Sequence, residues 1–235
     1  MIDYLGWDSK ILGRECGRIV IPESVVLSDF SVDDACDYLG SLDAGRYDFL
    51  VLRLPVSASV FCKAAVRMGF VCIEEIQKFR RLVEGFDSLD LSTFVPLGDE
   101  VEAAAWVAVD VFKYARFFVD PLIDNNLARW SRYSWVMNAY CDDEKRLFIV
   151  RDVGYVAGFV VVSLVGELEL IGVAGLHQRR GWGRALVDIA MNAVCAMGLD
   201  SIVVSTQRVN KPSLSLYRSM GFELVDRFST FHLHL

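Results

Sequence analysis

The sequence predicts an α/β fold built on a mixed β-sheet, with a truncated N-terminal half before a complete C-terminal domain. In the second half, short Val-rich and Leu-rich runs alternate with segments whose apolar residues recur at helical spacing. In the first half, residues 48–70 repeat the order of elements that residues 200–222 show, which favours a partial duplication of one fold.

The composition is that of a folded protein with a substantial core. The chain has 235 residues, of which 54% are hydrophobic and 23% charged. A net charge of −7 disfavours non-specific binding to nucleic acid, which needs a basic face. The cysteines are scattered without a CxxC pair, so we expect buried thiols in a reducing cytoplasm, and no metal site. Asp3, Asp8 and Lys10 interrupt any early apolar run, so no signal peptide is expected. The most apolar stretch, residues 156–166, is too short to span a bilayer.

The first half contains a strand–loop–helix unit that ends at Gly69-Phe70. Without gaps, residues 48–70 lie over residues 200–222. The identical pairs are Asp48/Asp200, Val51/Val203, Met68/Met220, Gly69/Gly221 and Phe70/Phe222. Identity of this extent can arise by chance, but the shared pattern of elements favours an internal duplication.

The first copy lacks polar residues that the second copy has. Ala58 lies opposite Asn210, and Ala65 lies opposite Tyr217, so the first copy is expected to be a structural half-domain. We therefore divide the chain into domains 1–90 and 91–235. The linker is expected at residues 84–99, which carry Gly, Ser, Asp and Pro.

Residues 101–143 are helical in pattern and rich in aromatic and charged side chains, most of which core packing explains. Arg116-Phe117-Phe118, followed by Asp120-Pro121, is typical of a loop that leaves a helix. A guanidinium beside aromatic rings could bind a phosphorylated ligand there. The alternative, of about equal weight, is an Arg116–Asp120 ion pair over two core phenylalanines.

From residue 146 onward the predicted elements alternate. Strands are expected at residues 146–151, 155–165, 167–173, 201–205 and in 222–235, and helices at residues 181–197 and 212–220. Gly198 and Gly221 end the helices, and Pro212 fits a first turn, where its missing N–H does no harm. His232 and His234 share one face of the last strand and are expected to pack or meet solvent.

Residues 178–184 (Gln-Arg-Arg-Gly-Trp-Gly-Arg) form a glycine-rich turn between a strand and a helix. Glycines let backbone N–H groups approach an anion, and the positive end of the helix dipole adds to them. An ordinary glycine-rich turn is the alternative. The turn is not a Walker A loop, since no Gly-Lys-Ser/Thr follows, and Leu186 replaces the third glycine of a dinucleotide fingerprint.

Two motifs resemble those of the GNAT superfamily of N-acetyltransferases. The first is Val173-(x)4-Gln178-x-x-Gly181-x-Gly183, which resembles the acyl-CoA signature Arg/Gln-x-x-Gly-x-Gly/Ala. The second is Asn210-(x)6-Tyr217-(x)3-Gly221-Phe222. They occur in the family's order, separated by one helix and one strand. The resemblance implies a GNAT fold, acetyl-CoA as cosubstrate, and acyl transfer to an amine.

The resemblance also implies roles for single residues. The backbone of Ile171, Gly172 and Val173 would pair with the pantetheine arm of CoA. The turn made of Gln178, Arg179, Arg180, Gly181, Trp182, Gly183 and Arg184 would hold the pyrophosphate. Asn210 would bond the pantetheine, and Tyr217 would act as general acid on the leaving thiolate, with a plain packing role as the alternative. Glu167 matches the position of a base in some GNAT enzymes, but a solvated strand residue is as good a reading, and no base is assigned.

A narrower resemblance covers most of the chain. Residues 5–13, residues 112–139 and Ser205-Thr206-Gln207-x-x-Asn210 resemble bacterial TDP-fucosamine acetyltransferases, although Lys10-Ile11-Leu12 replaces an expected aromatic pair. That family acetylates the amino group of a nucleotide-linked amino-deoxy sugar for surface polysaccharide synthesis. The resemblance implies that the acceptor is a small molecule, and it is compatible with a homodimer. We expect Arg116, Phe117 and Asp120 to contact the acceptor. The alternatives are a GNAT enzyme for another amine or protein N-terminus, and a non-catalytic acyl-CoA-binding protein.

Overall fold

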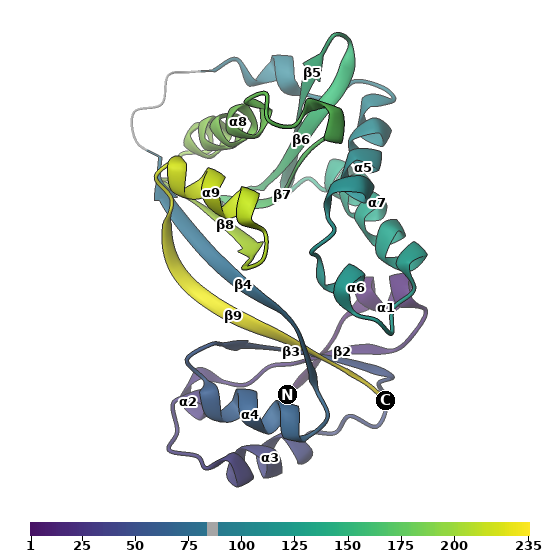
Figure 1. Cartoon of the computed structure of the whole chain (residues 1–235), viewed down its shortest axis with the longest axis vertical. Coiled ribbons are helices and arrows are strands. Elements are labelled where there is room, and N and C mark those ends of the chain that lie inside the picture. The colour runs from purple at the N-terminus through teal and green to yellow at the C-terminus, as the bar shows by residue number, and fades with distance from the viewer. Residues whose placement is uncertain (84–88) are drawn as a thin grey trace.

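The computed structural model describes residues 1–83 and 89–235, and these residues form one nine-stranded mixed sheet (Figure 1). The strand order is β1-β2-β3-β9-β4-β8-β7-β6-β5. The strands are β1 Ile2–Tyr4, β2 Cys16–Ile19, β3 Phe49–Pro55, β4 Val71–Leu82, β5 Lys145–Asp152, β6 Tyr155–Ser163, β7 Glu167–Val173, β8 Ser201–Gln207 and β9 Glu223–His234. The pairs β2–β3 and β7–β8 are parallel and the other described pairs are antiparallel, so the predicted mixed sheet is confirmed.

Helices cover both faces of the sheet. They are α1 Gly6–Leu12, α2 Glu23–Val26, α3 Val32–Gly40, α4 Ser59–Arg67, α5 Glu100–Val111, α6 Arg116–Val119, α7 Asn125–Cys141, α8 Trp182–Ala196 and α9 Lys211–Ser219, with 3₁₀ turns η1 Leu91–Phe94 and η2 Gly175–His177. Along β6 the side chains alternate between two cores. Val160 and Val162 pack in the core that includes α8, while Phe159 and Val161 pack in the core that includes α5 and α7.

The two similar segments of the chain have the same local structure and exchange their following strands. Residues 48–70 contain β3 and α4, and residues 200–222 contain β8 and α9. Strand β4, which follows the first unit, pairs with β8 of the second, and β9, which follows the second, pairs with β3 of the first. Strands β4 and β9 pair with each other and run side by side through the middle of the molecule (Figure 1). The sheet is therefore continuous across residue 90, where the sequence suggests a domain boundary.

Several local expectations need correction or completion. The segment predicted to be a loop at Arg116 forms the one-turn helix α6. Of the predicted linker, residues 84–88 lie outside the described residues, and residues 91–94 form η1. The cysteines are free, but Cys72 and Cys141 are exposed, so the expectation of buried thiols is wrong for these two. No helix in the described ranges combines the length and the apolar character that crossing a bilayer requires.

Candidate active site

Strands β7 and β8 separate soon after they begin to pair. Their parallel contact is limited to Glu167↔Val203 and Leu168↔Val204. Beyond Leu168, β7 stays paired with β6 up to Val173, so its backbone on that side is satisfied. The other edge of β7 turns toward the widening gap, where its N–H and C=O groups can accept an added extended chain.

A cavity of about 1420 Å³ opens at this splay. Its walls come from β7, β8, the turn before α8, helix α9 and, opposite, the segment from α5 to α7. The predicted residues that line it are Ile171, Gly172, Val173, Gln178, Arg179, Gly181, Gly183, Arg184, Asn210, Tyr217 and Arg116. Two motifs and one separate arginine, far apart in the sequence, thus share one cavity.

The turn before α8 has a defined backbone geometry. Arg179 and Gly181 have positive φ values of 63° and 90°, and α8 begins directly afterwards at Trp182. The Gln178 side chain donates to the Val173 carbonyl oxygen over 3.0 Å, which ties the turn to the end of β7. The first N–H groups of a helix have no partners within the helix. At α8 they lie at the cavity, where an anion can accept from them.

Two predicted turn residues do not line the cavity. Arg180 contacts Asp152 over 3.4 Å, and the same carboxylate contacts His177 Nδ1 over 2.9 Å. Trp182 is partly buried and packs against the core around α8. Trp182 therefore supports the turn through its side chain, and Arg180, whose side chain is 61% exposed, is linked to Asp152.

Asn210 immediately precedes α9, and Tyr217 lies within it. Asn210 caps the helix, since its Oδ1 accepts from the Ser213 N–H over 3.4 Å, and its Nδ2 donates to Thr206 Oγ1 over 3.2 Å. Tyr217 is 2% exposed, and its ring packs between Phe79 and Phe222. Burial raises the pKa of the Tyr217 phenol above its usual range, which keeps its proton in place at neutral pH.

Arg116 does not pair with Asp120, contrary to the alternative that the sequence left open. Its Nη2 contacts both oxygens of Asp8, over 2.7 and 2.6 Å, and its guanidinium lies 4.3 Å from the centre of the Phe117 ring. Phe117 is 1% exposed and Asp120 is 3% exposed, and neither lines the cavity. Of the three expected acceptor contacts, only Arg116 lines the cavity.

Among the other charged side chains that line this cavity are three that no sequence motif predicts and that lie on separate elements. Arg53 lies on β3, Glu74 on β4 and Arg132 on α7. Arg53 and Glu74 belong to the half that the sequence marks as structural. They reach the cavity because β4 and β9 join the two halves, which no local pattern in the sequence reveals.

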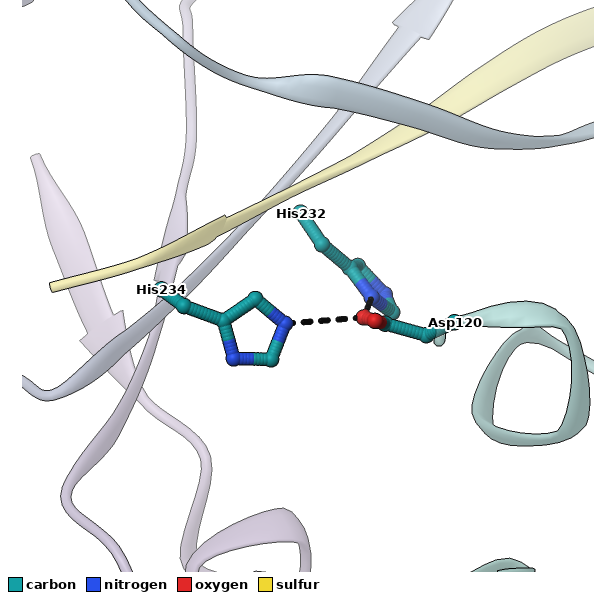
Figure 2. A group of neighbouring side chains, drawn as sticks. All are labelled: Asp120, His232 and His234. Carbon is teal, nitrogen blue, oxygen red and sulfur yellow. Dashed lines mark hydrogen bonds and ion pairs between the residues drawn. The ribbon is translucent and has the colours of Figure 1, made fainter. Parts of the chain in front are cut away.

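A cluster outside the cavity lining joins β9 to the residue after α6 (Figure 2). Oδ2 of Asp120 lies 2.6 Å from His232 Nδ1 and 2.9 Å from His234 Nε2. Among the described residues, these are the three whose ligand atoms could together hold a metal ion, all within 4.8 Å. Burial lowers the pKa of His232, and the hydrogen bond to Asp120 only partly opposes it. The two histidines do share one face of the strand, but they bind a carboxylate.

The fold and the cavity define a class of protein, and the comparisons agree. Residues 113–222 match the family model described as "Acetyltransferase (GNAT) family". This segment is therefore similar to the GNAT acetyltransferases, a class whose cosubstrate is acetyl-CoA. The curated relatives carry the name mycothiol acetyltransferase. That of Pseudarthrobacter chlorophenolicus is 27% identical over 175 residues, which cover 67% of this chain and 52% of the relative. That of Streptomyces avermitilis is 25% identical and is covered to the same 52%.

The chain thus spans about half the length of the curated relatives that it matches. Among solved structures, a GCN5-related N-acetyltransferase from Kribbella flavida has a TM-score of 0.60 at 14% identity, covering 93% of this chain and 80% of its own. A tandem GNAT protein from the clavulanic acid biosynthesis pathway has a TM-score of 0.56 at 12% identity, covering 93% and 75%. At these identities the likeness concerns the fold, and the predicted GNAT fold is confirmed.

Proposed function

We propose that the protein transfers an acetyl group from acetyl-CoA to the amino group of a small molecule. The observation that carries this proposal is the splay of β7 from β8 above the cavity, in a segment that matches the GNAT family. The open edge at residues 171–173 would bind the pantetheine arm. The turn at residues 178–184 would hold the pyrophosphate with its backbone N–H groups.

The chemistry needs a neutral amine and a proton for the leaving group. The amine nitrogen would attack the thioester carbonyl, so that a C–N bond forms and the C–S bond breaks. Tyr217 would donate its proton to the departing thiolate, while the amine nitrogen releases a proton to solvent, from which Tyr217 is reprotonated. Tyr217 lies in the cavity wall and keeps its proton at neutral pH, as a proton donor must. Asn210, already held by Thr206, would bond the pantetheine.

For the acceptor we propose a nucleotide-linked amino-deoxy sugar. The resemblance to TDP-fucosamine acetyltransferases supports it, as does the presence of Arg116 and the aromatic side chains Phe112, Tyr114 and Trp135 in the cavity wall. A guanidinium can bind phosphate oxygens, and aromatic rings can stack on a base or sugar. The names of the curated relatives favour a second candidate, the unacetylated form of mycothiol.

A turnover screen tests these proposals. Release of CoA from acetyl-CoA would be measured with nucleotide-linked amino sugars, the unacetylated form of mycothiol, amino acids and polyamines as acceptors. Preference for the nucleotide-linked sugars would support the first candidate, and preference for the thiol compound the second. Preference for a simple amine would reject both acceptor candidates and keep the acetyltransferase activity. Absence of turnover with every amine would overturn that activity.

A further inference from the structure

Three arginine side chains from three separate elements gather in the cavity outside the two GNAT motifs. Arg53 of β3, Arg116 of α6 and Arg132 of α7 all line it. Arg116 interacts electrostatically with each of the other two. Like charges repel, so a folded chain brings them together only if something else lowers the cost.

Neighbouring protein groups neutralise part of the positive charge of Arg53 and Arg116. Arg116 Nη2 binds Asp8, but its Nη1 is buried without a hydrogen-bond partner. Arg53 donates from Nε to Thr230 Oγ1 over 3.3 Å, and Glu74 and Glu167 act on it electrostatically. The two guanidinium groups are therefore partly compensated, with at least one donor left unused.

Arg132 is the least compensated of the three. It is 6% exposed, its Nε is buried without a hydrogen-bond partner, and it forms no ion pair with any residue that the structure describes. Burial, followed by the charge of Arg116, lowers its pKa to about 10, so it remains charged at neutral pH. Two aromatic rings attract this cation: the centre of the Trp135 ring lies 4.6 Å from the guanidinium carbon, and that of Phe112 lies 5.6 Å from it. Neither ring carries an oxygen or nitrogen acceptor for the N–H groups of Arg132.

A carboxylate lies among these cations. Glu74 is 9% exposed, lines the cavity and interacts electrostatically with Arg53 and Arg132. Its Oε2 accepts from Gln207 Nε2 over 3.0 Å. The pocket therefore offers unused guanidinium donors and, at Glu74, a carboxylate that Gln207 orients. Together these groups complement a molecule that carries an anion and an amine.

We propose that Arg53, Arg116 and Arg132 form an anion subsite, and that the acceptor is an amine carrying a phosphate or carboxylate group, with its amino group toward Glu74. This inference rests on the proposed acetyltransferase function and narrows its acceptor class. Nucleotide-linked amino sugars belong to the class. The subsite itself would bind an anion whether or not acetyl transfer follows, so binding and activity test different claims.

Binding is tested first, in protein saturated with CoA so that the pyrophosphate turn is occupied. Titration with inorganic pyrophosphate and, separately, with acetate is followed by calorimetry. We expect at least one anion to bind, with affinity reduced at least tenfold in Arg132→Met. The matched control is Arg129→Met on the same helix, where Arg129 is 4.0 Å from Asp110 and outside the cavity lining. Absence of binding, or equal loss in both variants, would overturn the subsite.

Stability separates a binding role from a structural one. Methionine replaces the aliphatic stem of arginine and carries no charge, so Arg132→Met removes a buried cation that has no ion-pair partner among the described residues. We expect an unchanged or higher Tm for this variant. A lowered Tm together with intact anion binding would assign Arg132 a structural role and overturn the proposal. Arg116 is a poorer test, because its removal would leave the carboxylate of Asp8, a residue that is 4% exposed, without its cation.

Activity then identifies the anion. Glucosamine and glucosamine 1-phosphate differ only by a phosphate, and tyramine and tyrosine only by a carboxylate. We expect kcat/KM to be at least tenfold higher for the anionic member of one pair, and Arg132→Met to reduce that ratio. If both members of each pair are acetylated with equal kcat/KM, the anion subsite is rejected but the proposed acetyltransferase activity stands. Anion binding lost in Arg132→Met, without acetylation of any amine, would keep the subsite and reject the activity.

Discussion

Tyr217 combines nearly complete burial with a place in the cavity wall, which fits a proton donor and equally a packing residue. Tyr217→Phe distinguishes the two, because it removes only the hydroxyl and keeps the ring contacts with Phe79 and Phe222. We expect Tm to be almost unchanged and kcat to fall on the order of 100-fold, with little change in KM for acetyl-CoA. Steady-state kinetics beside a thermal melt would measure this, and a kcat near that of the unmodified protein would leave packing as its role.

Gly183 is the sharpest single test of the pyrophosphate turn. A Cβ there would meet Leu216 Cδ2 at 3.4 Å, so the protein can nearly accommodate it, whereas the φ of 90° at Gly181 would add backbone strain. We expect Gly183→Val to abolish acetyl-CoA binding by calorimetry, because the branched side chain would stand where the phosphate approaches the N–H groups.

The control for this variant is its fold. Circular dichroism and Tm should remain close to those of the unmodified protein, so that lost binding reports on the turn alone. Full acetyl-CoA affinity in a folded Gly183→Val protein would mean that the pyrophosphate lies elsewhere.

At the scale of elements, strand β9 is joined to the residue after α6 by a titratable cluster. Burial lowers the pKa of His232 below 6.5, so below that pH the unfolded chain binds more protons and acid favours unfolding. Burial would raise the pKa of Asp120, but the hydrogen bonds from His232 and His234 outweigh it and hold that pKa well below 3.8. The ionised Asp120 therefore stabilises the folded state fully above about pH 3.8, and this stabilisation is lost as the pH falls below that value.

Both groups thus predict a Tm that falls on acidification, first through His232. The His232→Asn variant keeps an N–H donor for Asp120 but has no titrating ring. We expect its Tm to fall less steeply than that of the unmodified protein between about pH 7 and about pH 5. Parallel curves from thermal melts across this range would contradict the assignment.

At the scale of the whole molecule, the sheet is shared by the two halves. Strand β9 lies between β3 and β4, both of which precede residue 90, and β4 also pairs with β8. The division into domains 1–90 and 91–235 remains a prediction, and the pairing makes independent folding of the second piece unfavourable. A fragment of residues 91–235 would expose an unpaired edge on β8 and leave β9 without either neighbour.

We expect this fragment to lack a cooperative thermal transition, as measured by circular dichroism. The control is a chain of residues 5–235, which loses only the edge strand β1 and keeps every interior pair. Cooperative unfolding of the fragment would show that the second half folds alone and that β4 and β9 merely dock.

The sequence by itself determined the fold class, the order of elements from residue 145 onward and the cofactor motifs. These features are local: Gly181, Pro212 and Gly221 act through their own backbone geometry, and apolar periodicity acts over single helices and strands. The cavity therefore contains Gln178, Asn210 and Tyr217, as the motifs predicted.

Only the tertiary structure decided which distant side chains join them. Arg53 and Glu74 reach the cavity because two long strands exchange between the halves, and Arg132 reaches it from α7. Asp120 faces the histidines of β9 rather than Arg116. Charged residues carry no period of their own, and their partners are set by contacts across more than a hundred positions. The motif residues of the cavity wall were thus predictable from the sequence, while the charged residues that face them depended on long-range packing.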